Sequence, residues 1–110
     1  MLETNITSVR IMNIIKKYDE KELLLSVEGR IDTITSKDLE KEIDNEFGKF
    51  DSLTMDFTDL NYISSAGLRV LIVTQKKLKK EDIPFSIKNV NDAVGEIFKM
   101  SGFDKILKIE

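Results

Sequence analysis

The chain has 110 residues, of which 41% are hydrophobic and 34% are charged, and its formal net charge is −3. This length is typical of one domain with a modest hydrophobic core, so we expect a single domain over residues 1–110. The sequence contains no cysteine and no histidine, which excludes disulfides, thiolate nucleophiles, imidazole acid–base catalysis and metal sites built from these side chains. The mild acidity gives no support to a nucleic-acid-binding surface.

The sequence also predicts a protein that neither crosses a membrane nor catalyses a reaction. The first ten residues, MLETNITSVR, lack the apolar stretch of a signal peptide, and no later apolar run approaches the length of a membrane span. Carboxylates are scattered over the predicted polar faces, with no pair suited to acid–base catalysis. We therefore expect a cytoplasmic, non-enzymatic protein with no cofactor and no metal ion.

The first predicted elements are two strands. Residues 11–15 and 23–27 are short apolar runs, and the polar segment KKYDEKE separates them. This pattern is typical of a β-hairpin with a polar turn. Gly29, in the segment GRID, provides a bend after the second strand.

Residues 35–48 change the period of the pattern and predict a helix. Apolar residues recur every four positions, at Leu39, Ile43 and Phe47. They form a narrow stripe on a helix that is otherwise charged. Thr35 and Asp38 resemble a capping box at its start, and Gly48 stands where the helix would stop.

The next two elements are a strand and a second helix. Residues 52–60 alternate, with Leu53, Met55 and Phe57 on one side, which predicts a strand. After a turn that contains two serines, residues 68–80 predict a helix. Its apolar positions are Leu68, Leu71, Ile72 and Leu78.

The last third of the chain predicts a strand, a helix and a short final strand. Pro84 marks the exit from the preceding helix, and residues 85–90 form the strand. Residues 91–102 predict a helix that Asn91 or Asp92 caps and Gly102 ends. Residues 105–109 close the chain as a strand. The order β-β-α-β-α-β-α-β predicts an α/β fold, with a mixed sheet of four to five strands covered by three to four helices.

The segment NYISSAGLRVLI, residues 61–72, is the candidate functional site. It places Ser64 and Ser65 between a strand and a helix N-terminus, with Asp32 and Asp56 expected nearby. The simplest interpretation is that Ser65 caps the helix. The alternative is phosphorylation. A phosphoryl group carries a charge of roughly −1.5 to −2, which a helix N-terminus tolerates. We expect no nucleophilic role, since the chain has no histidine and no lysine at a motif spacing that would activate the hydroxyl.

The segment MDFTDLNYISSAGLRVLI resembles the signature of the STAS domain family, specifically the small single-domain anti-sigma factor antagonists of bacteria. The resemblance extends over nearly the whole chain. VEGRIDTITSKDLEKEI is similar to the family's Gly-x-apolar-Asp turn and first helix, and IFKMSGFDKILKI is similar to its C-terminal helix and strand.

This resemblance implies a switch in transcription regulation. The unphosphorylated protein would bind an anti-sigma factor that is also a serine kinase, and thereby free the sigma factor. The kinase would then phosphorylate Ser65 and end the complex, and a serine phosphatase would reset the protein, which we expect to be a monomer. The residues implied in partner binding are Asp32, Ser64, Ser65, Ala66, Gly67, Leu68 and Arg69.

The chain departs from the family pattern at one position of this motif. The antagonists have aspartate immediately before the phosphorylated serine, where this chain has Ser64. Ser64 is therefore the second candidate for the phosphorylated residue. The departure also leaves an alternative function open, in which the domain is a scaffold or a subunit of a signalling or transport complex and has no phosphate cycle.

Overall fold

A five-stranded mixed sheet forms the centre of the molecule, which we describe from a computed structural model over residues 11–110. The expectation about a signal peptide falls on residues 1–10 and lies outside the described residues. The strands are β2 (Met12–Asp19), β3 (Glu22–Ile31), β4 (Ser52–Asp56), β5 (Leu60–Ile63) and β6 (Phe85–Lys88). The order is β2-β3-β4-β6, and β5 pairs with β3; β2 pairs antiparallel with β3, and the other pairings are parallel. The predicted mixed sheet is confirmed.

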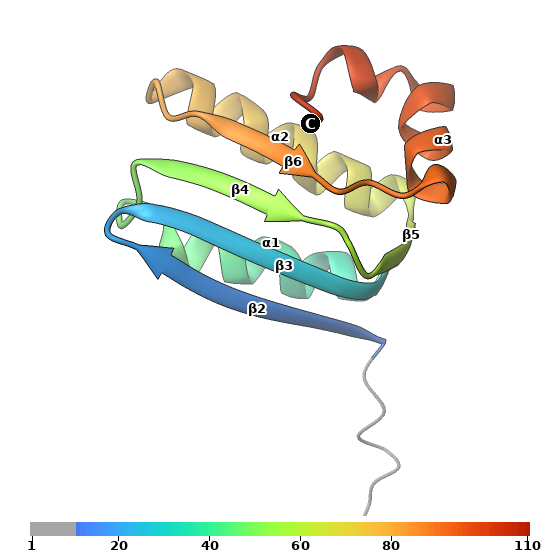
Figure 1. Cartoon of the computed structure of the whole chain (residues 1–110), viewed down its shortest axis with the longest axis horizontal. Helices are drawn as coiled ribbons and strands as arrows, with labels where there is room; N and C mark the ends of the chain where they lie inside the picture. The colour runs from blue at the N-terminus through green and yellow to red at the C-terminus, as the bar shows by residue number, and fades with distance from the viewer. Residues whose placement is uncertain (1–10) are drawn as a thin grey trace, which may run out of the picture.

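Three α-helices pack on this sheet (Figure 1). The helices are α1 (Thr35–Glu46), α2 (Ser65–Lys80) and α3 (Asp92–Ser101), and a 3₁₀ helix, η2 (Phe103–Lys105), follows. Figure 1 shows α1 and α2 behind the sheet and α3 at the end where β5 lies. In the part of the chain that the structure describes, the front face of the sheet carries no helix. None of the helices within residues 11–110 has both the length and the apolar character needed to cross a bilayer.

The hairpin of β2 and β3 is longer than the sequence pattern predicts. The pairing continues to Asp19 opposite Glu22, so most of the segment expected as a loop is strand. The turn takes place at two residues, and Glu20 adopts a left-handed backbone with φ of 56° to reverse the chain. Polar residues here lie on an exposed edge strand, where they need not be buried, and this explains why the pattern indicated a loop.

The prediction of one continuous strand over residues 52–60 is wrong. The carboxylate of Asp56 accepts hydrogen bonds from the backbone N–H and the hydroxyl of Thr58, at 3.0 and 2.6 Å, and this turn ends β4. The chain then enters β5, which pairs with the last residues of β3 beyond the end of β4. Phe57 is fully buried, so it continues the apolar alternation although it lies outside the strand.

The predicted final strand over residues 105–109 is also wrong. Residues 103–105 form η2 instead, and only a single bridge joins Ile109 to Ile87 of β6. The N–H of Ile87 donates to the carbonyl of Lys108 at 2.9 Å, and its carbonyl accepts from the N–H of Glu110 at 2.7 Å. The chain end therefore lies along β6 without extending the sheet as a strand.

A polar contact fastens the edge strand β2 to the end of α1. Glu46 is buried, and its carboxylate accepts from the ammonium of Lys16 at 2.7 Å and from the hydroxyl of Tyr18 at 2.8 Å. The bond to Lys16 is the main cause that lowers the pKa of Glu46. Burial, followed by the bond to Glu46, raises the pKa of Tyr18 to about 12. The carboxylate is thus ionised and paired, as a buried charge must be to be tolerated.

The hydrophobic core lies between the sheet and the helices α1 and α2. Leu23, Leu25 and Val27 of β3 alternate toward this side, and Leu39, Leu71 and Leu78 reach it from the helices. Five of the inward-facing positions predicted for these two helices are buried: Leu39, Ile43, Leu68, Leu71 and Leu78. The other two, Phe47 and Ile72, are partly buried against the core. The site described below is carried on this packed layer.

Leu71→Ala should lower the free energy of unfolding by about 2–5 kcal/mol, because Leu71 is fully buried and truncation leaves a cavity. Urea denaturation followed by circular dichroism measures the change. Met100→Ala is the control, since Met100 is 81% exposed, and it should change the stability by less than about 0.5 kcal/mol. Equal effects of the two substitutions would contradict the described core.

Candidate functional site

The turn between β5 and α2 carries the two serines, and it is anchored to the end of β3. β5 ends at Ile63 and α2 begins at Ser65, so the helix starts three residues earlier than the predicted range of 68–80. The backbone N–H of Ser64 donates to the carbonyl of Ile31, with 2.7 Å between nitrogen and oxygen. This bond sets the serine turn beside the turn that leads from β3 into α1.

Ser64, and not Ser65, caps the helix. Its backbone is extended (φ −87°, ψ 173°), as an N-cap requires, and its hydroxyl oxygen accepts from the N–H of Gly67 at 3.2 Å. The expectation that Ser65 supplies the cap is therefore wrong, because Ser65 is already the first residue of the helix. The side chain of Ser65 is exposed, whereas Ser64 is half-buried.

Gly67 and Leu68 hold the first turn of α2 against the sheet. A Cβ atom at Gly67 would lie 2.6 Å from Ile31 Cγ2 and 2.7 Å from Ile63 Cγ1, so the position has no room for a side chain. Leu68 is buried in the core. These two residues of the predicted partner-binding set therefore position the turn, while Arg69 on the next turn is exposed and Ala66 is half-buried.

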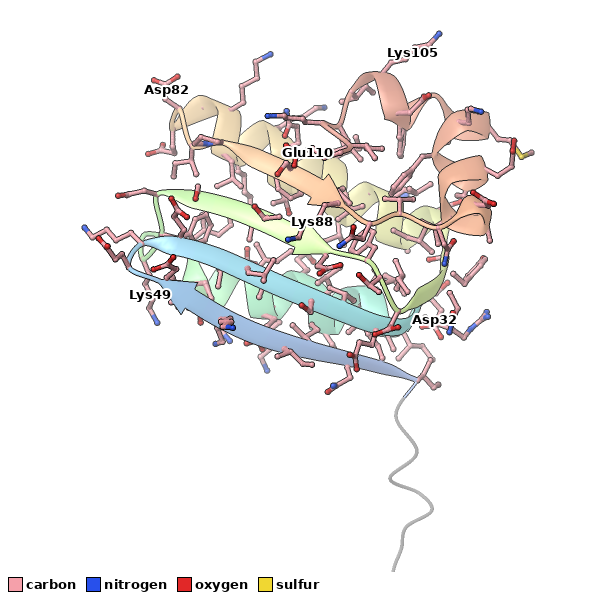
Figure 2. The ribbon with its side chains drawn as sticks, in the orientation of Figure 1. Asp32, Lys49, Asp82, Lys88, Lys105 and Glu110 are labelled. Atoms are coloured by element: carbon pink, nitrogen blue, oxygen red, sulfur yellow. The ribbon has the colours of Figure 1, made fainter. Side chains whose placement is uncertain are left out.

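Asp32 lies on the neighbouring turn, between the end of β3 and the start of α1. Its carboxylate accepts from the backbone N–H groups of Ile34 and Thr35 at 2.9 and 2.8 Å, and the hydroxyl of Thr35 accepts from the N–H of Asp32 at 2.8 Å. This reciprocal pair is a capping box. The box predicted for Thr35 and Asp38 is thus wrong: Thr35 is the last residue of a box that Asp32 begins. Figure 2 shows Asp32 at the end of β3, next to β5.

These hydrogen bonds keep the carboxylate of Asp32 ionised. The N–H of Thr35 is the main cause that lowers the pKa of Asp32, and the charge of Arg30 contributes. Because the pKa is lowered, the ionised group stabilises the fold above the pKa of the unfolded chain, and this contribution is lost as the pH falls through the lowered value. The guanidinium of Arg30 itself stacks on the ring of Tyr62, 4.4 Å from its centroid.

The second carboxylate expected near the serines is engaged elsewhere. Besides its bonds to Thr58, Asp56 accepts from the side-chain amide of Asn89 at 3.1 Å. These partners lie at the ends of β4 and β6, and none of the hydrogen bonds found for Asp56 reaches the serine turn. Within residues 11–110, no three acidic side chains gather in a way that would suit a metal ion.

A groove of about 270 Å³ between α1 and α2 opens beside the serine turn. Thr33, Lys37 and Glu40 line it from α1 and the turn before α1, and Ala66, Arg69 and Val70 line it from α2. Ile34, on the same turn as Asp32, is 74% exposed. Sequence reasoning missed the α1 side of this surface, since the charged residues there look like any solvated helix face.

The profile of the STAS domain matches residues 13–110. A Bordetella bronchiseptica protein named "Putative anti-sigma factor antagonist BtrV" is 30% identical over 88 residues, which are 79% of this chain and 76% of the relative.

Solved structures agree with that family match. An anti-sigma factor antagonist from Mycobacterium paratuberculosis superposes with a TM-score of 0.81 at 25% identity, over 89% of this chain and 84% of the other. The phosphorylated form of the Bacillus cell fate determinant SpoIIAA has a TM-score of 0.70 at 13% identity, over 89% and 91% of the two chains. The latter likeness concerns the fold alone.

Ser64→Ala should lower the free energy of unfolding by about 0.5–2 kcal/mol, because it removes the side-chain cap of α2. Ser65→Ala is the matched control, and it should cost less than about 0.5 kcal/mol since its side chain is exposed. Thermal or urea unfolding distinguishes the two. A larger loss for Ser65→Ala would return the capping role to Ser65.

Gly67→Ala should destabilise the protein by about 1–3 kcal/mol, because the added methyl group overlaps the side chains of Ile31 and Ile63. Gly95, inside α3, offers a control: a Cβ there would meet only Val90 Cγ1, at 3.6 Å. Gly95→Ala should instead stabilise the helix by up to about 1 kcal/mol. The same unfolding measurement tests both, and opposite signs are the expected result.

Proposed function

The chain belongs to the STAS domain family, and we propose that it acts as an anti-sigma factor antagonist controlled by phosphorylation of Ser65. In this proposal the unphosphorylated protein binds an anti-sigma factor with serine kinase activity, and the bound sigma factor is released. Phosphorylation of Ser65 ends the complex, and a separate serine phosphatase restores the active form. The protein is then a single-domain, monomeric, cytoplasmic regulator that catalyses no reaction itself.

The exposed hydroxyl of Ser65 is the observation that carries this proposal. It lies on the first turn of α2, beside a groove, while the neighbouring hydroxyl of Ser64 is engaged in the cap. A kinase can reach the Ser65 hydroxyl without breaking a hydrogen bond of the fold. Modification of Ser64 would replace the cap that accepts from Gly67, and this favours Ser65 over Ser64 as the acceptor.

The position of Ser65 also suits a switch that acts through charge. A phosphoryl group adds roughly −1.5 to −2 charges, and the N-terminus of a helix stabilises negative charge, so the fold should tolerate the modification. A partner docked on the same turn would have to bury that charge at considerable cost. The modified protein should therefore stay folded and lose its partner.

The partner surface we propose consists of the exposed and half-buried part of the predicted set. Asp32, Ser64, Ser65, Ala66 and Arg69 lie on two adjacent turns that the bond from Ser64 to Ile31 joins. Gly67 and Leu68 belong to the site as its buried support. SpoIIAA, whose fold this chain shares, has been solved in a phosphorylated form.

Incubation with the anti-sigma factor kinase of the same organism and ATP should add one phosphate, and peptide mass spectrometry should place it on Ser65. Ser65→Ala should block labelling and keep partner binding. Ser65→Asp should weaken binding at least about tenfold, as an unpaired charge in an interface does, with little change in melting temperature.

Ser64→Ala serves as the matched control, since it should still be labelled at Ser65. A label found on Ser64 would contradict the assignment of the acceptor. Partner binding that is equally strong for the phosphorylated and unphosphorylated protein would contradict the switch, and would favour a scaffold or complex subunit that has no phosphate cycle.

A further inference from the structure

Arg69 lies one helical turn after Ser65, and both side chains are exposed. Residues four apart in an α-helix are neighbours on its surface, with Cβ atoms about 5–6 Å apart. An anion that precedes a cation by four residues has the more favourable of the two possible orientations. A phosphoryl group on Ser65 would therefore have a guanidinium within reach on its own helix.

The other charges near the turn leave Arg69 as the cation suited to this pairing. The first turn of α2 contains no acidic residue, and the carboxylate of Asp32 already accepts from the first turn of α1. Among residues 11–110, the ion pairs do not include Arg69. Of the two alternative cations, Arg30 is stacked on Tyr62 at 4.4 Å, and Lys37 lies across the groove on α1.

We propose that Arg69 binds the phosphoryl group of Ser65 within the same chain, and so leaves the α1–α2 groove when the serine is modified. The inference rests on the proposed function, because it assumes that Ser65 is the phosphorylated residue. Arginine presents a planar fork of N–H donors that matches phosphate oxygens in two parallel hydrogen bonds.

This pairing changes the surface that a partner meets in two ways. The unmodified protein offers the guanidinium of Arg69 on the wall of the groove, opposite Glu40 and Lys37 of α1. After phosphorylation the groove loses that cation, and its entrance gains an anion. A partner carboxylate that bound Arg69 would then lose its contact and face a like charge.

The test uses the full chain with phosphoserine placed at position 65 by genetic code expansion, so that no kinase is needed. ³¹P NMR follows the titration of the phosphoryl group, whose second ionisation lies at about pH 6. A bound guanidinium favours the doubly ionised form and lowers the midpoint. Arg69→Gln should therefore raise the midpoint by about 0.3 pH units or more.

Lys76→Gln is the matched control, because it removes the same charge from an exposed position on the same face of α2. Lys76 lies about 16 Å from Ser65 along the helix axis. This distance exceeds the screening length at physiological salt, so the midpoint should move by less than about 0.1 pH units. Arg69→Lys should keep part of the effect, since lysine supplies the charge without the fork.

Equal shifts for Arg69→Gln and Lys76→Gln, or no shift for either, would overturn the proposal. A shift caused by Arg30→Gln and absent from Arg69→Gln would also overturn it and assign the phosphate to the other cation. Because phosphoserine is installed directly, this result is independent of whether a kinase labels Ser65. The two proposals can therefore fail separately.

Discussion

The contact of Gly67 with Ile31 and Ile63 is the constraint on which the candidate site depends. Where α2 begins, the backbone lies so close to these two side chains that even one added carbon atom would overlap them. The helix end therefore has a fixed depth against β3 and β5, and the bond from Ser64 to Ile31 holds its orientation. A helix end that could move would not keep two adjacent hydroxyls in different environments.

The separation of the two serines follows from that fixed geometry. Ser64 has the extended backbone of a cap and turns its hydroxyl toward the first amides of the helix, whereas Ser65 is the first helical residue and faces the solvent. The helix cap and the exposed hydroxyl are thus supplied by different residues. The same division holds on the adjacent turn, where Asp32 caps α1 and Ile34 is left exposed.

Local patterns predicted the elements whose periodicity is carried by buried residues. The helices α1, α2 and α3 and the strands β3, β4 and β6 follow apolar spacings that the core explains. The strand β5 was missed because Phe57 continues the apolar alternation of β4. The side chain of Asp56 forms a turn at this point, and the alternation does not show it. The final strand was overpredicted because Ile109 pairs at a single bridge.

The N-terminal caps of α1 and α2 were misplaced for a related reason, whereas Asn91 and Gly102 bound α3 as predicted. Ser64 and Ser65 are equivalent in sequence, and only the backbone angles show which one precedes the helix. The sequence suggested Thr35 as the first residue of a capping box. In the structure Asp32, which follows the end of β3, takes that position, and its carboxylate accepts from the N–H of Thr35. The groove between α1 and α2 depends on how two distant segments pack, so no spacing along the chain could indicate it.

The chain end beside β6 has a consequence for how molecules meet one another. A β-strand at the border of a sheet offers its backbone groups to a strand of a neighbouring molecule, which is a common route to aggregation. Here the carbonyl of Lys108 and the N–H of Glu110 occupy the outward groups of Ile87. Edge-to-edge pairing with β6 at this position would first require residues 108–110 to detach from it.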